Sequence, residues 1–236
     1  MKRKSKYNWL QITLFLLAVV GVGMAASVTI KMMIGVGAWD AICQSLYFMT
    51  GIEIGTIGIG LNVILLLAQI ALLRKNFRPI NLLQIPLSLL LGVVVNWTLY
   101  SLLTDFFIDN YLLQLLIFTL AIATMAFCVS LIVILDVVPF PAEGICLAIS
   151  TVTKWPFARV RQGFDVLCII SSLILTLIFS LTFTIREGTI IGMLILGPLL
   201  GFFIPRLEKL LEAHGIIQGK SKLEEEYEDM EGSMIL

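Results

Sequence analysis

Long apolar runs alternate with short polar segments along almost the whole chain. Uncharged, mainly apolar stretches recur at residues 7–30, 54–73, 80–104, 110–135, 166–185 and 188–205. A helix needs roughly 20 such residues to cross the hydrocarbon core of a bilayer, and all six stretches approach or exceed this length. The alternation of apolar and polar positions that is typical of membrane strands is absent from the sequence. The pattern predicts an all-α, polytopic membrane protein with about six transmembrane helices.

The composition supports this class. Hydrophobic residues make up 59% of the chain and charged residues only 14%, and the mean hydropathy is +1.01. Ordinary soluble domains carry more charge and fewer apolar residues. The basic N-terminus followed by an apolar run resembles a secretory signal, whose apolar region has about 7–15 residues. Here the run continues to Ile30, so we expect an uncleaved first span.

The chain contains an internal repeat. Residues 10–63 align with 113–166 without a gap, and the matches include Gln11/Gln114, Asp40/Glu143, Cys43/Cys146 and Asn62/Asp165. Polar matches are harder than apolar ones to attribute to composition. The repeat predicts two homologous membrane halves, 9–104 and 112–207. We expect a basic cytoplasmic N-terminus at 1–8, and a cytoplasmic helix end with an acidic disordered tail at 208–236.

The charges suggest that the two halves are inverted. The basic cluster of Arg74, Lys75 and Arg78 has no basic counterpart in the second half, and Arg159 and Arg161 have neutral counterparts in the first. Lys and Arg accumulate on the cytoplasmic side, so a basic loop with a neutral mate indicates opposite sides of the membrane. We expect three crossings per half and both termini in the cytoplasm.

A short extra segment lies between the first and second span of each half, at 38–50 and 142–152. Such a segment extends only ~16–20 Å as a helix and is too short to cross. Glycines and prolines flank both segments. Membrane proteins tolerate broken backbone where it is buried or lines a wet cavity. Two arrangements remain open: a re-entrant or broken helix, and an interfacial helix lying flat on the membrane surface.

Ionisable residues in these segments are the candidates for function. At the start of a short helix, Asp40 or Glu143 is favoured by about 0.3–1 kcal/mol, whereas a charge near the bilayer centre costs roughly 2.5–3.5 kcal/mol. Arg161 and Asp165 can pair on one helix, marking either its cytoplasmic end or the mouth of a polar cavity. We expect all four to converge on one cavity, because membrane charges must pair, reach water or titrate. An anionic group could settle there beside Arg161.

Other chemistry is not indicated. The single histidine, His214, has no metal-ligand cluster beside it, and all four cysteines lie in apolar or nearly apolar segments. We therefore expect no metal site, no disulfides and no cofactor, and without a nucleotide or nucleophile motif we expect no catalytic residues. Polar residues expected to form interhelical hydrogen bonds, worth ~0.6 kcal/mol each, are Gln44, Gln69, Gln84 and Asn96.

Three segments carry glycine-rich motifs: GAWDAICQSLYFMTGIEIGT (37–56), PAEGICLAISTVTKWPFARVRQGFD (141–165) and EGTIIGMLILGPLLG (187–201). They resemble the YczE/YyaS/YitT family of bacterial integral membrane proteins over about residues 10–205. The chain departs from that family's pattern at Ala38, where proline is usual, at Asp165, where the acid is often Glu, and at Ala142–Gly144, where Arg-Asp-Gly is more usual. The resemblance implies a multi-pass protein of the bacterial plasma membrane. The family has no established activity, and transport is commonly proposed for it from its architecture.

Two hypotheses for function follow. The first is a small secondary transporter or exporter of an unknown small molecule, because inverted repeats with interrupted helices place a binding site near the midplane. Its candidate substrate-binding or proton-coupling residues are Trp39, Asp40, Asn62, Glu143, Arg161 and Asp165.

The second hypothesis is a non-transporting membrane protein that assists or regulates a partner complex. Its contacts would be the acidic tail and a small-residue face at 21–27, although that face could equally pack inside the protein. An intramembrane enzyme would need a nucleophile–base or metal constellation, which the sequence lacks. The expected partners are the lipid bilayer and an unidentified small-molecule substrate, with no nucleic acid; a homo-oligomer is left open.

Overall fold

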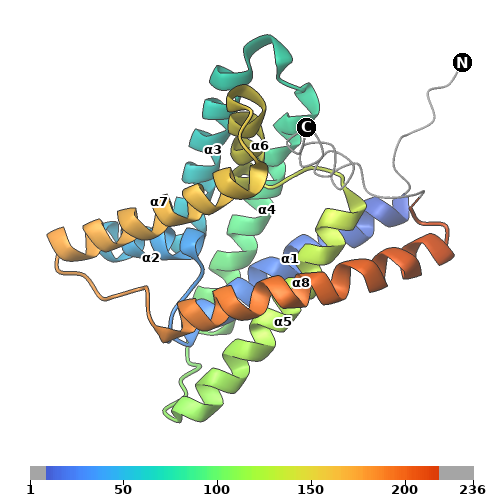
Figure 1. Cartoon of the computed structure of the whole chain (residues 1–236). Coiled ribbons are helices and arrows are strands. Elements are labelled where there is room, and N and C mark those ends of the chain that lie inside the picture. Colours follow the sequence, from blue (N-terminus) through green and yellow to red (C-terminus); the bar gives the residue numbers. More distant parts are fainter. Residues whose placement is uncertain (1–8, 218–236) are drawn as a thin grey trace, which may run out of the picture.

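The computed structural model describes residues 9–217, and every regular element in that range is helical. The α-helices are α1 (Trp9–Lys31), α2 (Ala38–Thr50), α3 (Ile54–Leu73), α4 (Gln84–Trp97), α5 (Tyr111–Leu135), α6 (Pro141–Thr153), α7 (Phe157–Ile178) and α8 (Glu187–Ala213). Two 3-10 helices, η1 (Arg74–Asn76) and η2 (Pro79–Leu83), join α3 to α4, and a π-helical turn, η3 (Thr98–Leu102), continues α4. The all-α prediction is confirmed (Figure 1).

Within the described range, six helical segments are long and apolar enough to cross a membrane: Trp9–Lys31, Ile54–Asn76, Pro79–Leu102, Tyr111–Leu135, Phe157–Ile178 and Glu187–Ala213. Large apolar side chains such as Leu67, Leu177 and Leu194 are more than half exposed, while Gln69 and Gln84 are fully buried. Apolar side chains on the outer surface are suited to lipid, while the interior, although mainly apolar, also holds buried polar side chains. The architecture is that of a multi-pass membrane protein.

One predicted span has different bounds. The apolar pattern placed the fifth span at 166–185, whereas the helix runs from Phe157 to Ile178. Hydropathy excluded the first turns because they are charged, but Arg161 and Asp165 form an ion pair within the helix. The helix ends just before Ser180, whose positive φ of 50° is incompatible with a further helical turn. The chain then continues without regular structure to the start of α8.

The ends of the chain bear on two further predictions. The helix α8 continues beyond residue 207, the predicted end of the second repeat, to Ala213. The basic segment at 1–8 and the acidic tail from residue 218 onward lie outside the described residues.

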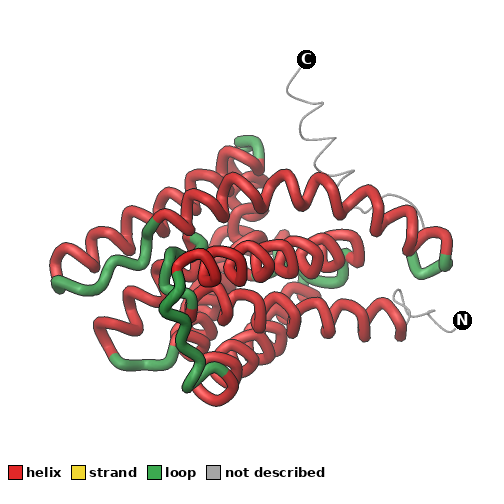
Figure 2. Tube along the Cα trace, turned by 90° about the horizontal axis from the view of Figure 1, so that it is seen from below, coloured by secondary structure: helices red, strands yellow, loops and turns green. Residues whose placement is uncertain are grey.

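The helices form two groups of four, whose members are labelled in Figure 1. Figure 2 shows the same helical chain turned by 90°. In the first group α1 packs against α4 and α5, and α5 packs against α8. In the second group the short helices α2 and α6 each pack on both α3 and α7. The contact between α3 and α4 joins the two groups.

Most contacts made by the first four helices recur among the last four. If α1 to α4 correspond to α5 to α8, the pair α1–α4 becomes α5–α8, α2–α3 becomes α6–α7, and α2–α7 becomes α6–α3. All of these pairs are packed. The exception is α3–α4, because α7 and α8 do not pack closely against each other in the described part of the chain.

Two buried apolar clusters show in which direction the helices run. One cluster joins the first half of α1 to the start of α4 and the end of α8, through Phe15, Leu87 and Leu211. The other joins the segment after α1 to the first half of α5 and to α8, and includes Ile34 and Phe118. The helices α1 and α4 therefore run one way and α5 and α8 the other, as an alternating series of crossings requires.

The small-residue face of α1 is buried inside the protein. A Cβ on Gly21 would lie 2.5 Å from Cys128 Sγ of α5, and a Cβ on Gly23 would lie 2.9 Å from Val94 of α4. Ser27 on the same face is fully buried. These small residues let α1 approach both neighbours closely. The face is therefore an intramolecular packing surface and is not free to bind a partner.

Candidate functional site

A cavity of about 200 Å³ lies where the two groups of helices meet. Val22 of α1, Leu91 of α4 and Met125 of α5 line it, and each is near the middle of its membrane span. Five of the candidates predicted from the sequence also line it: Trp39, Asp40, Asn62, Glu143 and Arg161. Asp165, the sixth, is not part of the lining, but it pairs with Arg161, which is. The structure brings the candidates together; their role in binding or proton coupling stays a prediction.

Asp40 and Glu143 occupy equivalent positions in α2 and α6. The N-cap residues are Gly37 and Phe140, which places each acid at the third helical position. Neither N-cap residue provides a side-chain capping bond, so the positive helix ends have the nearby carboxylates to offset them. Both acids line one cavity, whereas interfacial helices on opposite surfaces would hold them some 30 Å apart. This favours the buried, broken-helix arrangement.

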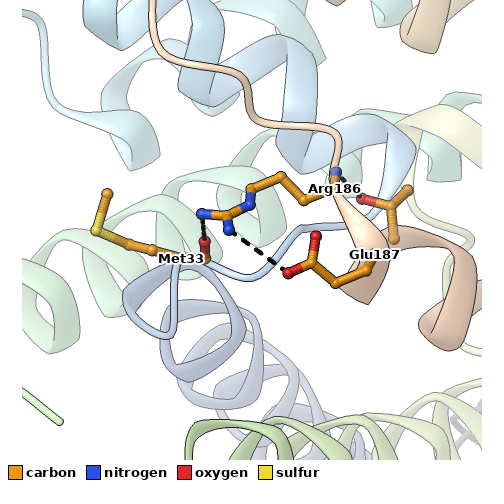
Figure 3. A network of polar contacts seen from close by, with 4 residues as sticks. Met33, Arg186 and Glu187 are labelled. Carbon is orange, nitrogen blue, oxygen red and sulfur yellow. Dashed lines mark hydrogen bonds and ion pairs between the residues drawn. The ribbon is translucent and has the colours of Figure 1, made fainter. Parts of the chain in front are cut away.

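The loop that leads into α2 is anchored on the start of α8. Arg186 Nη1 donates a hydrogen bond to the Met33 carbonyl at 2.8 Å, and Nη2 lies 3.5 Å from Glu187 Oε1 (Figure 3). The Val36 N–H donates to Thr189 Oγ1 at 3.1 Å. These contacts fix the loop only a few residues before Asp40. Nothing in the sequence indicated these contacts, because the loop at 33–36 and the start of α8 at 186–189 lie far apart along the chain.

The start of α6 is held by two buried glutamines. Gln69 Nε2 of α3 donates to Gln84 Oε1 at 3.0 Å and to the Pro141 carbonyl at 3.2 Å, and Gln84 Nε2 of α4 donates to Gln69 Oε1 at 3.3 Å. Gly144 leaves room for them, since a Cβ there would lie 2.6 Å from Gln69 Oε1. The prediction of interhelical hydrogen bonds is confirmed for both glutamines. Together they position the first turn of α6 and therefore Glu143.

Asn96 makes a similar connection between α4 and the start of α3. Its Oδ1 accepts from the Gly55 N–H at 2.7 Å, and its Nδ2 donates to Thr56 Oγ1 at 2.9 Å. A Cβ on Gly55 would overlap the Gly92 carbonyl, so only glycine permits this close approach. The hydrogen-bonding prediction is confirmed for Asn96 as well. For Gln44, the remaining candidate, the prediction is wrong: its side chain is buried but forms no hydrogen bond with the described residues, and it lines a second cavity instead.

Arg161 is shared by two carboxylates. Its Nη1 lies 3.2 Å from Glu143 Oε1 and its Nη2 lies 3.3 Å from Asp165 Oδ1. The predicted pair within α7 is confirmed, and Glu143 joins it from α6. The Arg161 guanidinium carbon lies 5.8 Å from the centre of the Phe164 ring. Trp39 of α2 stacks on Phe164 with ring centres 6.1 Å apart, so α2, α6 and α7 meet at this point.

Two carboxylates keep unused hydrogen-bonding capacity. Glu143 Oε2 is buried and accepts no hydrogen bond from any described residue. The Asp40 carboxylate forms no ion pair or hydrogen bond with the residues at 9–217. Burial raises the pKa of Asp40 to about 6; burial also raises the pKa of Glu143, although the Arg161 guanidinium lowers it. This shift brings the ionisation of Asp40 closer to neutral pH than that of an ordinary aspartate.

A second cavity of about 450 Å³ lies beside the first, next to the segment 103–110. Lys31, Gln44 and Asp109 contribute polar groups to its lining. Ile54 lines both cavities and is itself buried. Its side chain therefore lies where the two cavities meet. We call the second, larger cavity the vestibule.

The sequence of the chain matches a known family model. The chain belongs to DUF6198, a family of unknown function. The family model matches residues 9–205, a range that begins with α1, ends within α8 and includes the whole candidate site. A search of curated proteins and a search of solved structures each found no match. The resemblance to the YczE/YyaS/YitT family stays a prediction, and the function must be argued from the site.

Proposed function

We propose that the protein is a small secondary transporter of the bacterial plasma membrane that works by alternating access between two inverted halves. The observation that carries the proposal is the cavity at mid-height of the spans, on which ionisable residues of both halves converge. Ionisable residues inside a membrane are costly and usually mark a substrate or ion pathway. Secondary transporters place such sites between their repeats, at the N-termini of interrupted helices.

The exchange of helix contacts between the halves supports the inverted repeat. The short helix of each half packs against the spanning helix of the other half, α2 on α7 and α6 on α3. Each half therefore contributes to the walls of the site a short helix and the spanning helix on which the short helix of the other half packs. A rocking motion of one half against the other would change which side of the cavity is covered while leaving the acids in place.

The distribution of charge supports the proposed orientation. Arg78 before α4, Arg159 in the first turn of α7 and Lys209 near the end of α8 lie at one end of the alternating spans. Asp105 and Asp109 lie in the segment at the other end. Since Lys and Arg accumulate in the cytoplasm, the basic end and both termini are cytoplasmic. The vestibule next to 103–110 then opens toward the outside, and Ile54 lies on the outer route to the site.

A pair of cysteine variants tests alternating access without knowledge of the substrate. Gly58 lines the cavity and Gly60 of the same helix is exposed on its outer face. An added Cβ at either position meets no atom within 4 Å, so both thiols fit. The four native cysteines are replaced by alanine, and Gly58→Cys and Gly60→Cys are treated with a membrane-impermeant thiol reagent in right-side-out and inside-out vesicles.

We expect Gly58→Cys to react in both vesicle orientations, because an alternating cavity is open to each side in turn. Gly60→Cys is the matched control and should react in neither, because it faces lipid. Reaction of Gly58→Cys from one side only, or from neither, would contradict alternating access and favour the non-transporting hypothesis. If Asp40 or Glu143 takes up protons, an applied pH gradient should change the ratio of the Gly58→Cys labelling rates in right-side-out and inside-out vesicles.

A further inference from the structure

We propose that the cavity takes a small organic cation and that the Asp40 carboxylate binds its charge. This inference rests on the transporter proposed above and names the class of its substrate. It differs from the expectation that an anion would settle beside Arg161. That guanidinium already forms ion pairs with Glu143 and Asp165, so its charge is balanced, although its Nη1 makes no hydrogen bond to the described residues.

The balance of charge at the site leaves room for one cation. Three carboxylates, those of Asp40, Glu143 and Asp165, stand against the single guanidinium of Arg161. The N-termini of α2 and α6 each add about half a positive charge. The site therefore carries about one negative charge in excess. Asp40 is the acid without a partner among the described residues, and Glu143 Oε2 is a second buried acceptor without a donor.

The walls of the cavity suit an organic cation better than a hydrated ion. Apolar and aromatic side chains line the cavity beside the carboxylates, among them Trp39, Ile59, Leu91 and Phe140. An aromatic face attracts a quaternary or protonated amine, and more strongly when the cation is desolvated. The volume of about 200 Å³ is below the ~300–1,000 Å³ of pockets for drug-sized ligands. The ligand is therefore a small amine or quaternary ammonium ion.

A proton and the cation would compete for the same carboxylate. The titratable groups that line the cavity with Asp40 are Cys43, Glu143 and Arg161. Asp165 and Cys168 lie on α7, which packs against the helix of Asp40. Since burial raises the pKa of Asp40 to about 6, a modest fall in pH protonates it. A cation entering from one side would then displace a proton, which is the exchange that a proton-coupled exporter requires.

Three probes of equal size and different charge test the proposal: choline, its neutral carbon isostere 3,3-dimethylbutan-1-ol, and 3,3-dimethylbutanoate. Binding to the purified full-length protein in detergent is measured by titration calorimetry. We expect choline to bind at least about tenfold more tightly than the alcohol. Its affinity should fall about tenfold from pH 7.5 to pH 5.0, since only about a tenth of a carboxyl with a pKa of about 6 is ionised at pH 5.0.

Two variants connect the binding to the proposed residue. Asp40→Asn should weaken choline binding by about tenfold or more, remove its pH dependence and leave binding of the neutral alcohol unchanged. Asp40→Glu should restore both affinity and pH dependence, which a merely structural role would not explain. Glu53→Gln removes an exposed carboxylate outside the cavity and should have no effect. The unchanged alcohol binding also shows that each variant is folded.

Three results would overturn the inference: tighter binding of the carboxylate than of choline, equal or undetectable binding of all three probes, or unchanged choline binding in Asp40→Asn. The first would indicate an anion site at Arg161. These equilibrium measurements do not depend on transport. Failure of choline to bind, together with two-sided labelling of Gly58→Cys, would leave a transporter with another substrate. Binding with one-sided labelling would leave a cation-binding protein that does not transport.

Discussion

Replacing Gln69 with methionine should lower the free energy of unfolding by about 2 kcal/mol. Gln69 and Gln84 are fully buried, and three hydrogen bonds join their amides to each other and to the Pro141 carbonyl. Interhelical hydrogen bonds in membrane proteins contribute ~0.6 kcal/mol each on average, which gives about 2 kcal/mol for three. Methionine fills a similar volume but leaves the Gln84 amide buried without a partner, a cost of about 1–3 kcal/mol. The two values agree.

The double variant Gln69→Met/Gln84→Met separates hydrogen bonding from packing. Both amides are then replaced by apolar groups of similar shape, and only the Pro141 carbonyl loses a donor. We expect the double variant to lie within about 1 kcal/mol of the original protein, and so to be more stable than either single variant. Unfolding is followed by circular dichroism during detergent or thermal denaturation. A loss in the double variant equal to the sum of the two single losses would refute the reasoning, because the amides would then not be energetically coupled.

Further predictions concern helix packing, the ion pairs and the orientation in the membrane. Gly55→Ala should destabilise the protein by roughly 1–3 kcal/mol because its Cβ would overlap the Gly92 carbonyl. Gly60→Ala, whose Cβ would meet no atom within 4 Å, should leave stability unchanged or raise it by up to ~1 kcal/mol in the same denaturation assay. Arg161→Gln should cost roughly 1–3 kcal/mol at pH 8, because two carboxylates then face each other without a cation. The loss should be smaller at pH 5, where protonation removes the repulsion, and an equal loss at both pH values would contradict this account. In the cysteine-free background, Asp109→Cys should react with an impermeant reagent only from outside the cell, and reaction only from inside would exclude the proposed topology.

The positions of the helices could be predicted from local sequence. The segment predicted at 38–50 matches α2, and the one predicted at 142–152 differs by a single residue at each end from Pro141–Thr153. Glycine and proline mark these ends because they interrupt helical backbone. The fifth span was misplaced for a physical reason. Low hydropathy at charged residues suggests that a span ends there, but the charge of Arg161 is balanced by Asp165 of the same helix and by Glu143 of α6.

The candidate site could be predicted only in part. The internal repeat related Asp40 to Glu143, and a spacing of four residues related Arg161 to Asp165. The repeat could not show that Glu143 would reach Arg161 on another helix, a contact of 3.2 Å. Nor did it indicate that the guanidinium charge of Arg161 would be balanced by two carboxylates. For this reason we propose a cation as the ligand, where the sequence alone suggested an anion.

The sequence by itself determined what depends on neighbouring residues: the membrane class, the number of spans, the two short helices and the acids in their first turns. Only the tertiary structure decided which faces of the helices meet. It placed both acids on one cavity, and it joined Arg186 to the carbonyl of Met33. The physical reason is the solvent. In water an apolar stripe identifies the buried face of a helix, but lipid leaves both the outer and the inner faces apolar, so their rotation is fixed by packing and by hydrogen bonds between distant residues.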